Sequence, residues 1–109
     1  MAHRRIDVHQ HLVPRPYADW LRDKGIAEAG GRELPAWSAD EALRVLEAHG
    51  IAAAVLSIST PGVHLDPTRT VCPVARDMAR RVNEEAASVA QRHPGRFGFF
   101  ATLTLPDVD

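Results

Sequence analysis

The chain has 109 residues, of which 45% are hydrophobic and 25% charged, a composition that excludes disorder, collagen and a disulfide scaffold. Thirteen basic and 14 acidic residues give a net charge of −1, which excludes a nucleic-acid partner for want of an attracting field. The longest apolar run, 51–56, is as short as a strand, so we expect no membrane partner. Because the single Cys72 cannot form an internal disulfide, we expect a cytoplasmic protein.

Short apolar runs alternate with helical patterns along the chain, which is typical of βαβ units and a parallel sheet. The first run, 5–11, alternates strictly and predicts a strand with two distinct faces. One face carries Ile6 and Val8, and the other carries Asp7, His9 and His11. If the sheet closes into a barrel, we expect the polar face to point toward the barrel axis and the two aliphatic residues to pack on the helices outside.

The rest of the chain continues the α/β pattern. A glycine-broken stretch that runs from Gly25 to Pro35 predicts a long loop, typical of a lid or binding loop. Ser38 and Glu41 form a capping-box signal for a helix that Gly50 ends. The other predicted elements are a short helix over 16–22, a buried strand over 51–58, a long helix over 74–93 and a third strand over 97–103.

A pair of histidines ends the first predicted strand. His9 and His11 stand two positions apart, so both rings project from one face of a strand. Two imidazole nitrogens at bond lengths of about 2.0–2.1 Å can grip one metal ion. The carboxyl end of a strand is also where parallel α/β folds hold ligands. We predict that His9 and His11 are metal ligands and that Asp7 orients one of them from outside the coordination sphere.

It stays open that these histidines bind no metal, since the same spacing arises by chance and catalytic zinc usually takes three protein ligands. Three further residues are candidates for contact with a substrate: Arg32 and Trp37 in the long loop, and His64 after the second long strand. Trp37 can equally pack against the start of a helix. The sequence identifies no catalytic acid or base.

Several ordered motifs together resemble the amidohydrolase superfamily, and more closely the amidohydrolase-2 group that contains aminocarboxymuconate-semialdehyde decarboxylase. The stretch 6–14, which reads IDVHQHLVP, is similar to the opening strand of that group. The other matching stretches are 37–38, 56–63, 83–84, 93–98 and 103–107. The resemblance therefore covers nearly the whole chain.

The resemblance implies a metal-dependent enzyme on a (β/α)8 TIM barrel, with His9 and His11 holding a divalent metal, most often Zn²⁺. It implies a decarboxylase that acts on a small carboxylated substrate of aromatic or muconate-like type. Hydrolysis of C–N or C–O bonds is an alternative within the superfamily, and other barrels with two such histidines, the phosphoesterase and deoxyribonuclease types, are further alternatives. A non-catalytic remnant that binds itself or a partner is an alternative of another class.

A barrel of this type needs about 250 residues, so we expect residues 1–109 to form one segment of an incomplete barrel, its N-terminal part, with about three βα units. The remaining ligands that the resemblance implies have no counterparts here, and we expect the segment to be inactive alone. Its open sheet edges and uncovered apolar face predict a homo-oligomer.

Overall fold

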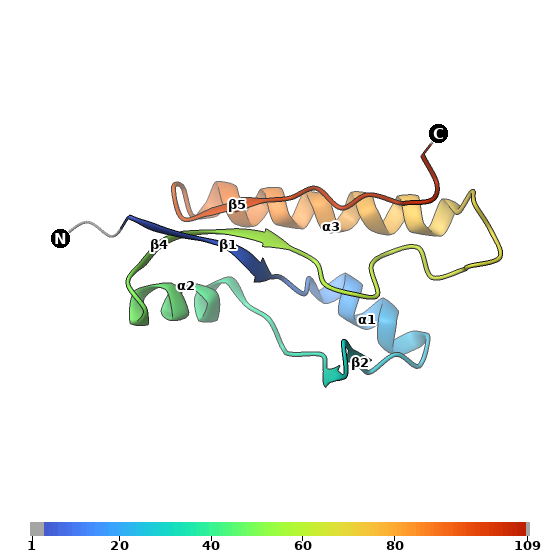
Figure 1. The fold of residues 1–109 in the computed structure, drawn as a ribbon, viewed down its shortest axis with the longest axis horizontal. Helices are drawn as coiled ribbons and strands as arrows, with labels where there is room; N and C mark the ends of the chain where they lie inside the picture. The colour runs from blue at the N-terminus through green and yellow to red at the C-terminus, as the bar shows by residue number, and fades with distance from the viewer. Residues whose placement is uncertain (1–3, 109) are drawn as a thin grey trace.

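A computed structural model describes residues 4–108 of the chain (Figure 1). The elements in chain order are β1 (Arg5–His11), α1 (Arg15–Asp23), β2 (Glu28–Ala29), β3 (Arg32–Glu33), α2 (Ala39–Ala48), β4 (Ile51–Ser57), α3 (Pro73–Arg92) and β5 (Phe97–Phe99). The long strands form one sheet in the order β1-β4-β5, and both pairings are parallel. The prediction of a parallel α/β arrangement is therefore confirmed.

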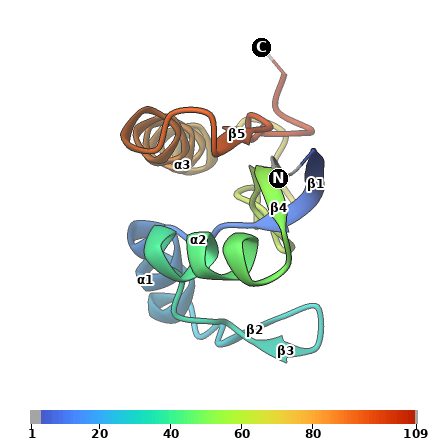
Figure 2. The same cartoon turned by 90° about the vertical axis from the view of Figure 1, so that its left-hand side faces the viewer.

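Helices α2 and α3 pack on the same face of this sheet, as Figure 2 shows end-on. The apolar face of β4 is central to the contact, since Ala54 and Leu56 are fully buried. Against them pack Leu46 from α2 and Val89 from α3. On the opposite face of the sheet, the aliphatic residues of β1 are exposed. One side of the sheet is thus covered by helices, whereas the other carries exposed apolar side chains.

The 20-residue helix α3 joins two hydrophobic clusters. Its carboxyl-terminal half packs on the sheet, and its amino-terminal half packs on α1 through Met78 and Val82. Tyr17 and Leu21 of α1 supply the other side of that contact. Because α1 directly follows β1, α3 spans both the sheet and the helix that comes after the first strand.

The first strand departs from the strict alternation predicted for it. Asp7 pairs with Ala54 and Gln10 pairs with Leu56, so three steps along β1 match two along β4. This bulge puts Asp7 and Gln10 on the same face of the strand. The expectation that Asp7 shares a face with the histidines was wrong for that reason, because a bulge reverses the side-chain order that a regular strand would have.

The two aliphatic residues of β1 were expected to pack on helices, and that expectation was also wrong. Ile6 is 61% exposed and Val8 is 64% exposed. Ile6 pairs with Ala53, which lies on the opposite face of β4 from the buried Ala54. Within residues 4–108 the helices cover only that other face, so nothing described shields these two side chains.

The long loop after α1 contains a small hairpin that the sequence patterns did not predict. Strands β2 and β3 pair antiparallel through Ala29 and Arg32. Gly30 and Gly31 have φ angles of 59° and 79°, and a two-residue turn with positive φ at both positions joins twisted strands favourably. The glycines that mark a loop in the sequence thus form a hairpin turn.

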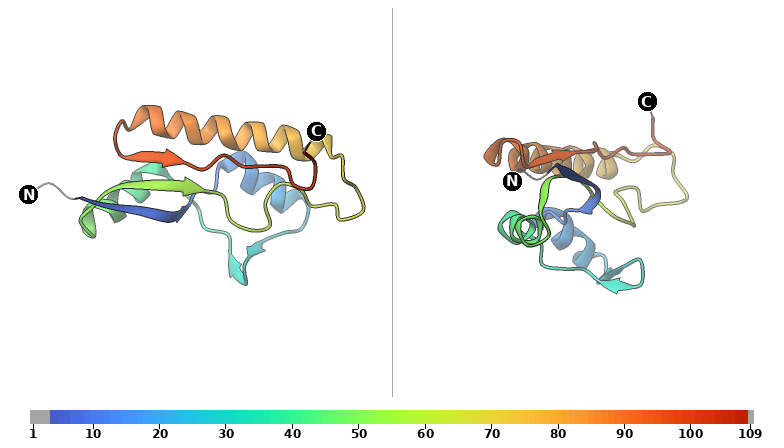
Figure 3. Two further views of the ribbon diagram at one scale, coloured as in Figure 1. Left: turned by 45° about the horizontal axis from the view of Figure 1, so that its top comes forward. Right: turned by 60° about the vertical axis from the view of Figure 1, so that its left-hand side comes forward.

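The third predicted strand is shorter than expected. The ladder of β5 ends at Phe99, although Phe100 still donates its N–H to the carbonyl of Leu56 at 2.9 Å. Beyond this point the chain runs alongside α3 to the last described residues (Figures 1 and 3). Leu103 and Leu105 in this segment are 69% and 63% exposed. No helix within residues 4–108 combines the length and hydropathy that crossing a membrane requires.

Candidate metal centre

The two histidines lie together at the carboxyl end of β1. Their ring centroids are 5.0 Å apart, and the ring planes cross at 84°. Both side chains are exposed. The spacing prediction of neighbouring imidazoles is therefore confirmed, even though the strand carrying them is bulged.

Ser57, the last residue of β4, determines how the ring of His11 is held. Nδ1 of His11 lies 3.1 Å from the carbonyl oxygen of Ser57. A carbonyl can only accept a hydrogen bond, so Nδ1 carries the proton and donates it. The other nitrogen, Nε2, then presents its lone pair. This is how metal-binding histidines are commonly fixed, with one ring nitrogen on a backbone carbonyl and the other on the metal.

Asp7 contacts the histidine segment through the backbone. Its Oδ1 accepts the N–H of His9 at 3.0 Å, and its Oδ2 accepts Nε2 of Gln10 at 3.2 Å. Both bonds close short loops across the bulge, and they hold the backbone of His9 in place. Asp7 thus contacts the main chain of one predicted ligand and the side chain of the residue between the two.

A divalent metal fits the donors on this edge only in part. Two imidazoles are suitable ligands for zinc and manganese, and the free Nε2 of His11 is the kind of group that binds them. Among residues 4–108, however, no three histidine, cysteine or acidic side chains gather closely enough to hold an ion. The described residues therefore bring two candidate imidazole donors together and add no third one.

The three predicted substrate residues lie in different places. Trp37 lines a cavity of about 260 Å³ together with His11, so the structure brings these two together. Arg32 is exposed on β3 of the hairpin. His64 is half-buried in the loop between β4 and α3, where its Nε2 donates to the carbonyl of Thr70 at 3.1 Å.

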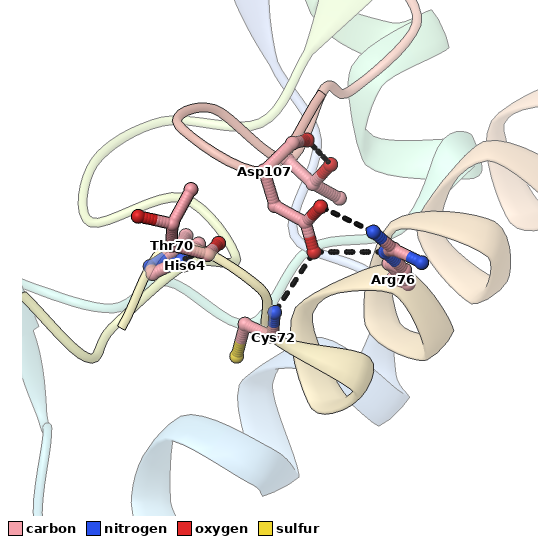
Figure 4. Close-up of polar contacts among 6 residues, drawn as sticks. His64, Thr70, Cys72, Arg76 and Asp107 are labelled. Carbon is pink, nitrogen blue, oxygen red and sulfur yellow. Dashed lines mark hydrogen bonds and ion pairs between the residues drawn. The ribbon is translucent and has the colours of Figure 1, made fainter. Parts of the chain in front are cut away.

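A buried carboxylate that the sequence patterns did not identify lies close to His64. Asp107 is 3% exposed, and it accepts hydrogen bonds from Nε of Arg76 and from the N–H of Cys72, each at 2.8 Å (Figure 4). Arg76 also donates to it through a second guanidinium nitrogen. The hydrogen bonds of Arg76, followed by that of Cys72, lower the pKa of Asp107 to about 2. The carboxylate thus links the start of α3 to the segment after β5.

Sequence reasoning could have found Ser57 but not Asp107. The carboxyl ends of neighbouring parallel strands meet at one edge, and Ser57 lies at the end of the strand predicted next to the histidines. A cavity of about 360 Å³ at this edge is lined by residues 57–62 and 100–103. Asp107 pairs with a residue 31 positions away, and no local spacing signals such a contact.

No family model matches the chain, but individual proteins are similar to it. Decarboxylase yanB of Aspergillus niger is 33% identical over 99 residues, which are 91% of this chain and 26% of that protein. Gamma-resorcylate decarboxylase of Rhizobium radiobacter is 40% identical over 70 residues, 64% of this chain and 20% of that protein. The chain therefore spans about a quarter of the length of these relatives.

Solved structures agree with the sequence relatives. A crystal structure of amidohydrolase II superposes with a TM-score of 0.80 at 27% identity, covering 94% of this chain and 32% of that one. A dihydroxybenzoic acid decarboxylase from Polaromonas sp. JS666, solved with bound manganese and the inhibitor 2-nitroresorcinol, superposes with a TM-score of 0.61 at 30% identity. It covers 93% of this chain and 30% of that one.

The parallel strands thus form an α/β fragment that is similar to about a third of the length of TIM-barrel amidohydrolase structures. The resemblance predicted from the sequence is confirmed: the homologues of this chain are decarboxylases of the amidohydrolase-2 family, and the chain matches a fragment of each.

Proposed function

We propose that residues 1–109 form the N-terminal segment of a metal-dependent decarboxylase, with His9 and His11 as the first two metal ligands. The observation that carries this proposal is the bond from Nδ1 of His11 to the carbonyl of Ser57. In the neutral ring this bond leaves Nε2, the nitrogen that we propose for the metal, with its lone pair free. The decarboxylase names of the relatives support the reaction class.

The substrate class of the proposal is a small aromatic carboxylate. Relatives are named for gamma-resorcylate and 6-methylsalicylic acid, and one similar structure is a complex with 2,6-dihydroxybenzoate. A bound divalent metal, for which we propose Zn²⁺ ahead of Mn²⁺, would hold and polarise such a substrate. Arg32, Trp37 and His64 remain proposed substrate contacts, and Trp37 shares a cavity with His11.

Within this chain, each residue at the edge has a defined structural task. Ser57 holds the ring of His11 by its carbonyl. The carboxylate of Asp7 accepts the backbone N–H of His9, and through this bond Asp7 would orient a metal ligand. We propose a cytoplasmic location, which the lone Cys72 supports. Hydrolysis of C–N or C–O bonds is the alternative reaction.

A metal titration followed by calorimetry tests the proposal on the chain as it exists. We expect Zn²⁺ and Mn²⁺ to bind at micromolar or weaker affinity, since only two protein ligands are present. Binding should vanish in the His9→Ala/His11→Ala double variant and persist in His49→Ala, whose histidine is exposed at the end of α2. Metal binding that survives in the double variant would contradict the metal assignment. We expect no release of CO₂ from 2,6-dihydroxybenzoate by the chain alone.

A specific observation favours self-association as a second property of the chain. The apolar side chains that are most exposed lie on β1 and in the segment after β5: Ile6, Val8, Phe100, Leu103, Leu105 and Val108. Exposed apolar surface at unpaired strand edges favours contact between copies. Light scattering coupled to size exclusion should show an oligomer, which Val8→Lys should shift toward the monomer. A monomer at all concentrations would reject this part of the proposal.

A further inference from the structure

A cavity of about 500 Å³, open to solvent, lies between the end of α1 and the segment that leads into α3. Its floor is apolar: Val63 is 2% exposed, and Ile26 and Leu65 are half-buried and pack against the hydrophobic cluster that joins α1 to α3. The lining residues that are exposed, and so form its mouth, are Lys24, Arg69, Pro73 and Val74. Ligand sites in proteins typically have about 300–1,000 Å³ and mostly apolar walls with a few polar groups. This cavity meets both conditions.

The apolar walls suit an aliphatic chain better than a flat ring. Trp20 is the one aromatic residue of the lining, and Nζ of Lys24 lies over its ring at 5.4 Å from the centroid. One face of the indole is therefore already covered by a cation. The other apolar walls are mostly branched aliphatic side chains. Apolar cavities of roughly 150 Å³ already accept benzene, so this volume has room for a chain of more than six carbons.

The charges at the mouth favour an anionic head group. The lining contains two cations, Lys24 and Arg69, and one carboxylate, Asp66. Asp66 is already occupied, since its Oδ1 accepts the N–H of Thr68 at 2.9 Å and its Oδ2 lies 3.5 Å from Nε of Arg69. Lys24 pairs with no carboxylate within residues 4–108. The ammonium of Lys24 is thus left to attract an anion, and it would repel a second cation.

We propose that this cavity is a second ligand site, which binds a medium-chain aliphatic carboxylate. The chain would lie on Ile26, Val63 and Leu65, and the carboxylate would lie beside Lys24. Neither His9 nor His11 lines the cavity, so the inference depends neither on the metal centre nor on the proposed reaction.

Intrinsic fluorescence tests this proposal with octanoate as the probe, in EDTA so that no metal contributes. The chain has two tryptophans, and Trp20 lines the cavity whereas Trp37 does not. We expect octanoate to change the fluorescence of the full chain saturably. The change should be kept in Trp37→Phe and lost in Trp20→Phe. Hexanoate, which has two methylenes fewer, should bind about four- to tenfold more weakly, because it removes less apolar surface from water.

Charge variants at the mouth test the head group. Lys24→Gln should weaken octanoate about two- to fivefold, as expected for an exposed ion pair. Val74 and Val71 form a matched pair, since each is 54% exposed and only Val74 lines the cavity. Val74→Asp should weaken octanoate by a similar factor, and the added acid suits the first turn of α3, so the fold should be kept. Val71→Asp should leave the affinity within about twofold of the parent.

Octylamine, which carries the same chain on a cationic head, is the control ligand. It should bind the parent chain more weakly than octanoate does. No saturable change, an affinity for octanoate that Lys24→Gln leaves unaltered, equal losses in the two aspartate variants, or tighter binding of octylamine would overturn the proposal. The comparison of octanoate, hexanoate and octylamine needs only the parent chain, so it decides the matter even where a variant does not fold.

Discussion

The side-chain amide of Asn83, in the middle of α3, pairs in both directions with the backbone of Thr102. Its Oδ1 accepts the N–H of Thr102 at 2.7 Å, and its Nδ2 donates to the carbonyl of the same residue at 3.1 Å. An asparagine amide has the same donor and acceptor as a peptide group. Asn83 therefore takes the place of a neighbouring strand, and it fastens the segment after β5 to the helix.

Replacing Asn83 by alanine should destabilise the chain by about 1–3 kcal/mol, because two partly buried hydrogen bonds are lost at roughly 0.5–1.5 kcal/mol each. Urea denaturation followed by circular dichroism measures the change. The exposed neighbour Glu84 provides the control, since Glu84→Ala should stay within about 0.5 kcal/mol of the parent. Equal stability of the two variants would show that the amide pairing contributes nothing.

Acid should weaken the junction formed by Asp107 and Arg76. Their hydrogen bonds lower the pKa of Asp107 from 3.8 to about 2. Because this pKa is lower in the folded chain than in the unfolded chain, the stabilisation is complete above about pH 4 and is lost as the pH falls toward 2. Asp107→Asn should be less stable than the parent at pH 6, and the difference should shrink by pH 2. As the control, Asp23→Asn on an exposed residue should stay within about 0.5 kcal/mol of the parent at pH 6.

Alkali should act on Tyr17, the only tyrosine of the chain. Its hydroxyl donates to the carbonyl of Gly62 at 2.8 Å, and burial raises its pKa to about 12. A pKa raised by folding means that its stabilisation is present below pH 10 and is lost as the pH rises toward 12. Tyrosinate absorbance should therefore titrate well above pH 10 while the chain is folded. Tyr17→Phe should cost about 1 kcal/mol at neutral pH and should lack this loss in alkali.

Removal of the Ser57 hydroxyl should hardly change metal binding. The carbonyl of Ser57 lies 3.1 Å from Nδ1 of His11, whereas its Oγ lies 3.4 Å away, so the carbonyl makes the better hydrogen bond. Loss of a partner that orients a ligand typically lowers metal affinity by about 10- to 100-fold. Ser57→Ala keeps the carbonyl and should stay below that range in a zinc titration, with His11→Ala as the comparison. A tenfold loss would transfer the role to the hydroxyl.

Local patterns determined most of the secondary structure. The capping box of Ser38 and Glu41 is present, with Oγ of Ser38 accepting the N–H of Glu41 at 3.1 Å. The strand over 5–11 has the predicted bounds, and the long helix differs by one residue at each end. Such features depend on neighbours a few positions apart, so a single chain segment is enough to predict them.

The candidate site was likewise predictable where it depends on neighbouring residues and not where it depends on distant ones. The spacing of His9 and His11 was sufficient to predict adjacent rings, because a strand projects alternate side chains to one face. The bulge that turns Asp7 toward Gln10 could not be predicted, since it arises from the register against β4. The carbonyl that fixes His11 also comes from β4, 46 residues away in sequence.

The sequence by itself thus determined a parallel α/β segment with a pair of histidines at a strand end, since both follow from short-range periodicity. Only the tertiary structure decided which nitrogen of His11 bonds to a carbonyl, that Asp7 and Gln10 share a face of β1, and that Asp107 pairs with Arg76. These depend on contacts between residues far apart in the chain, and the packing of α3 against both the sheet and α1 brings them together.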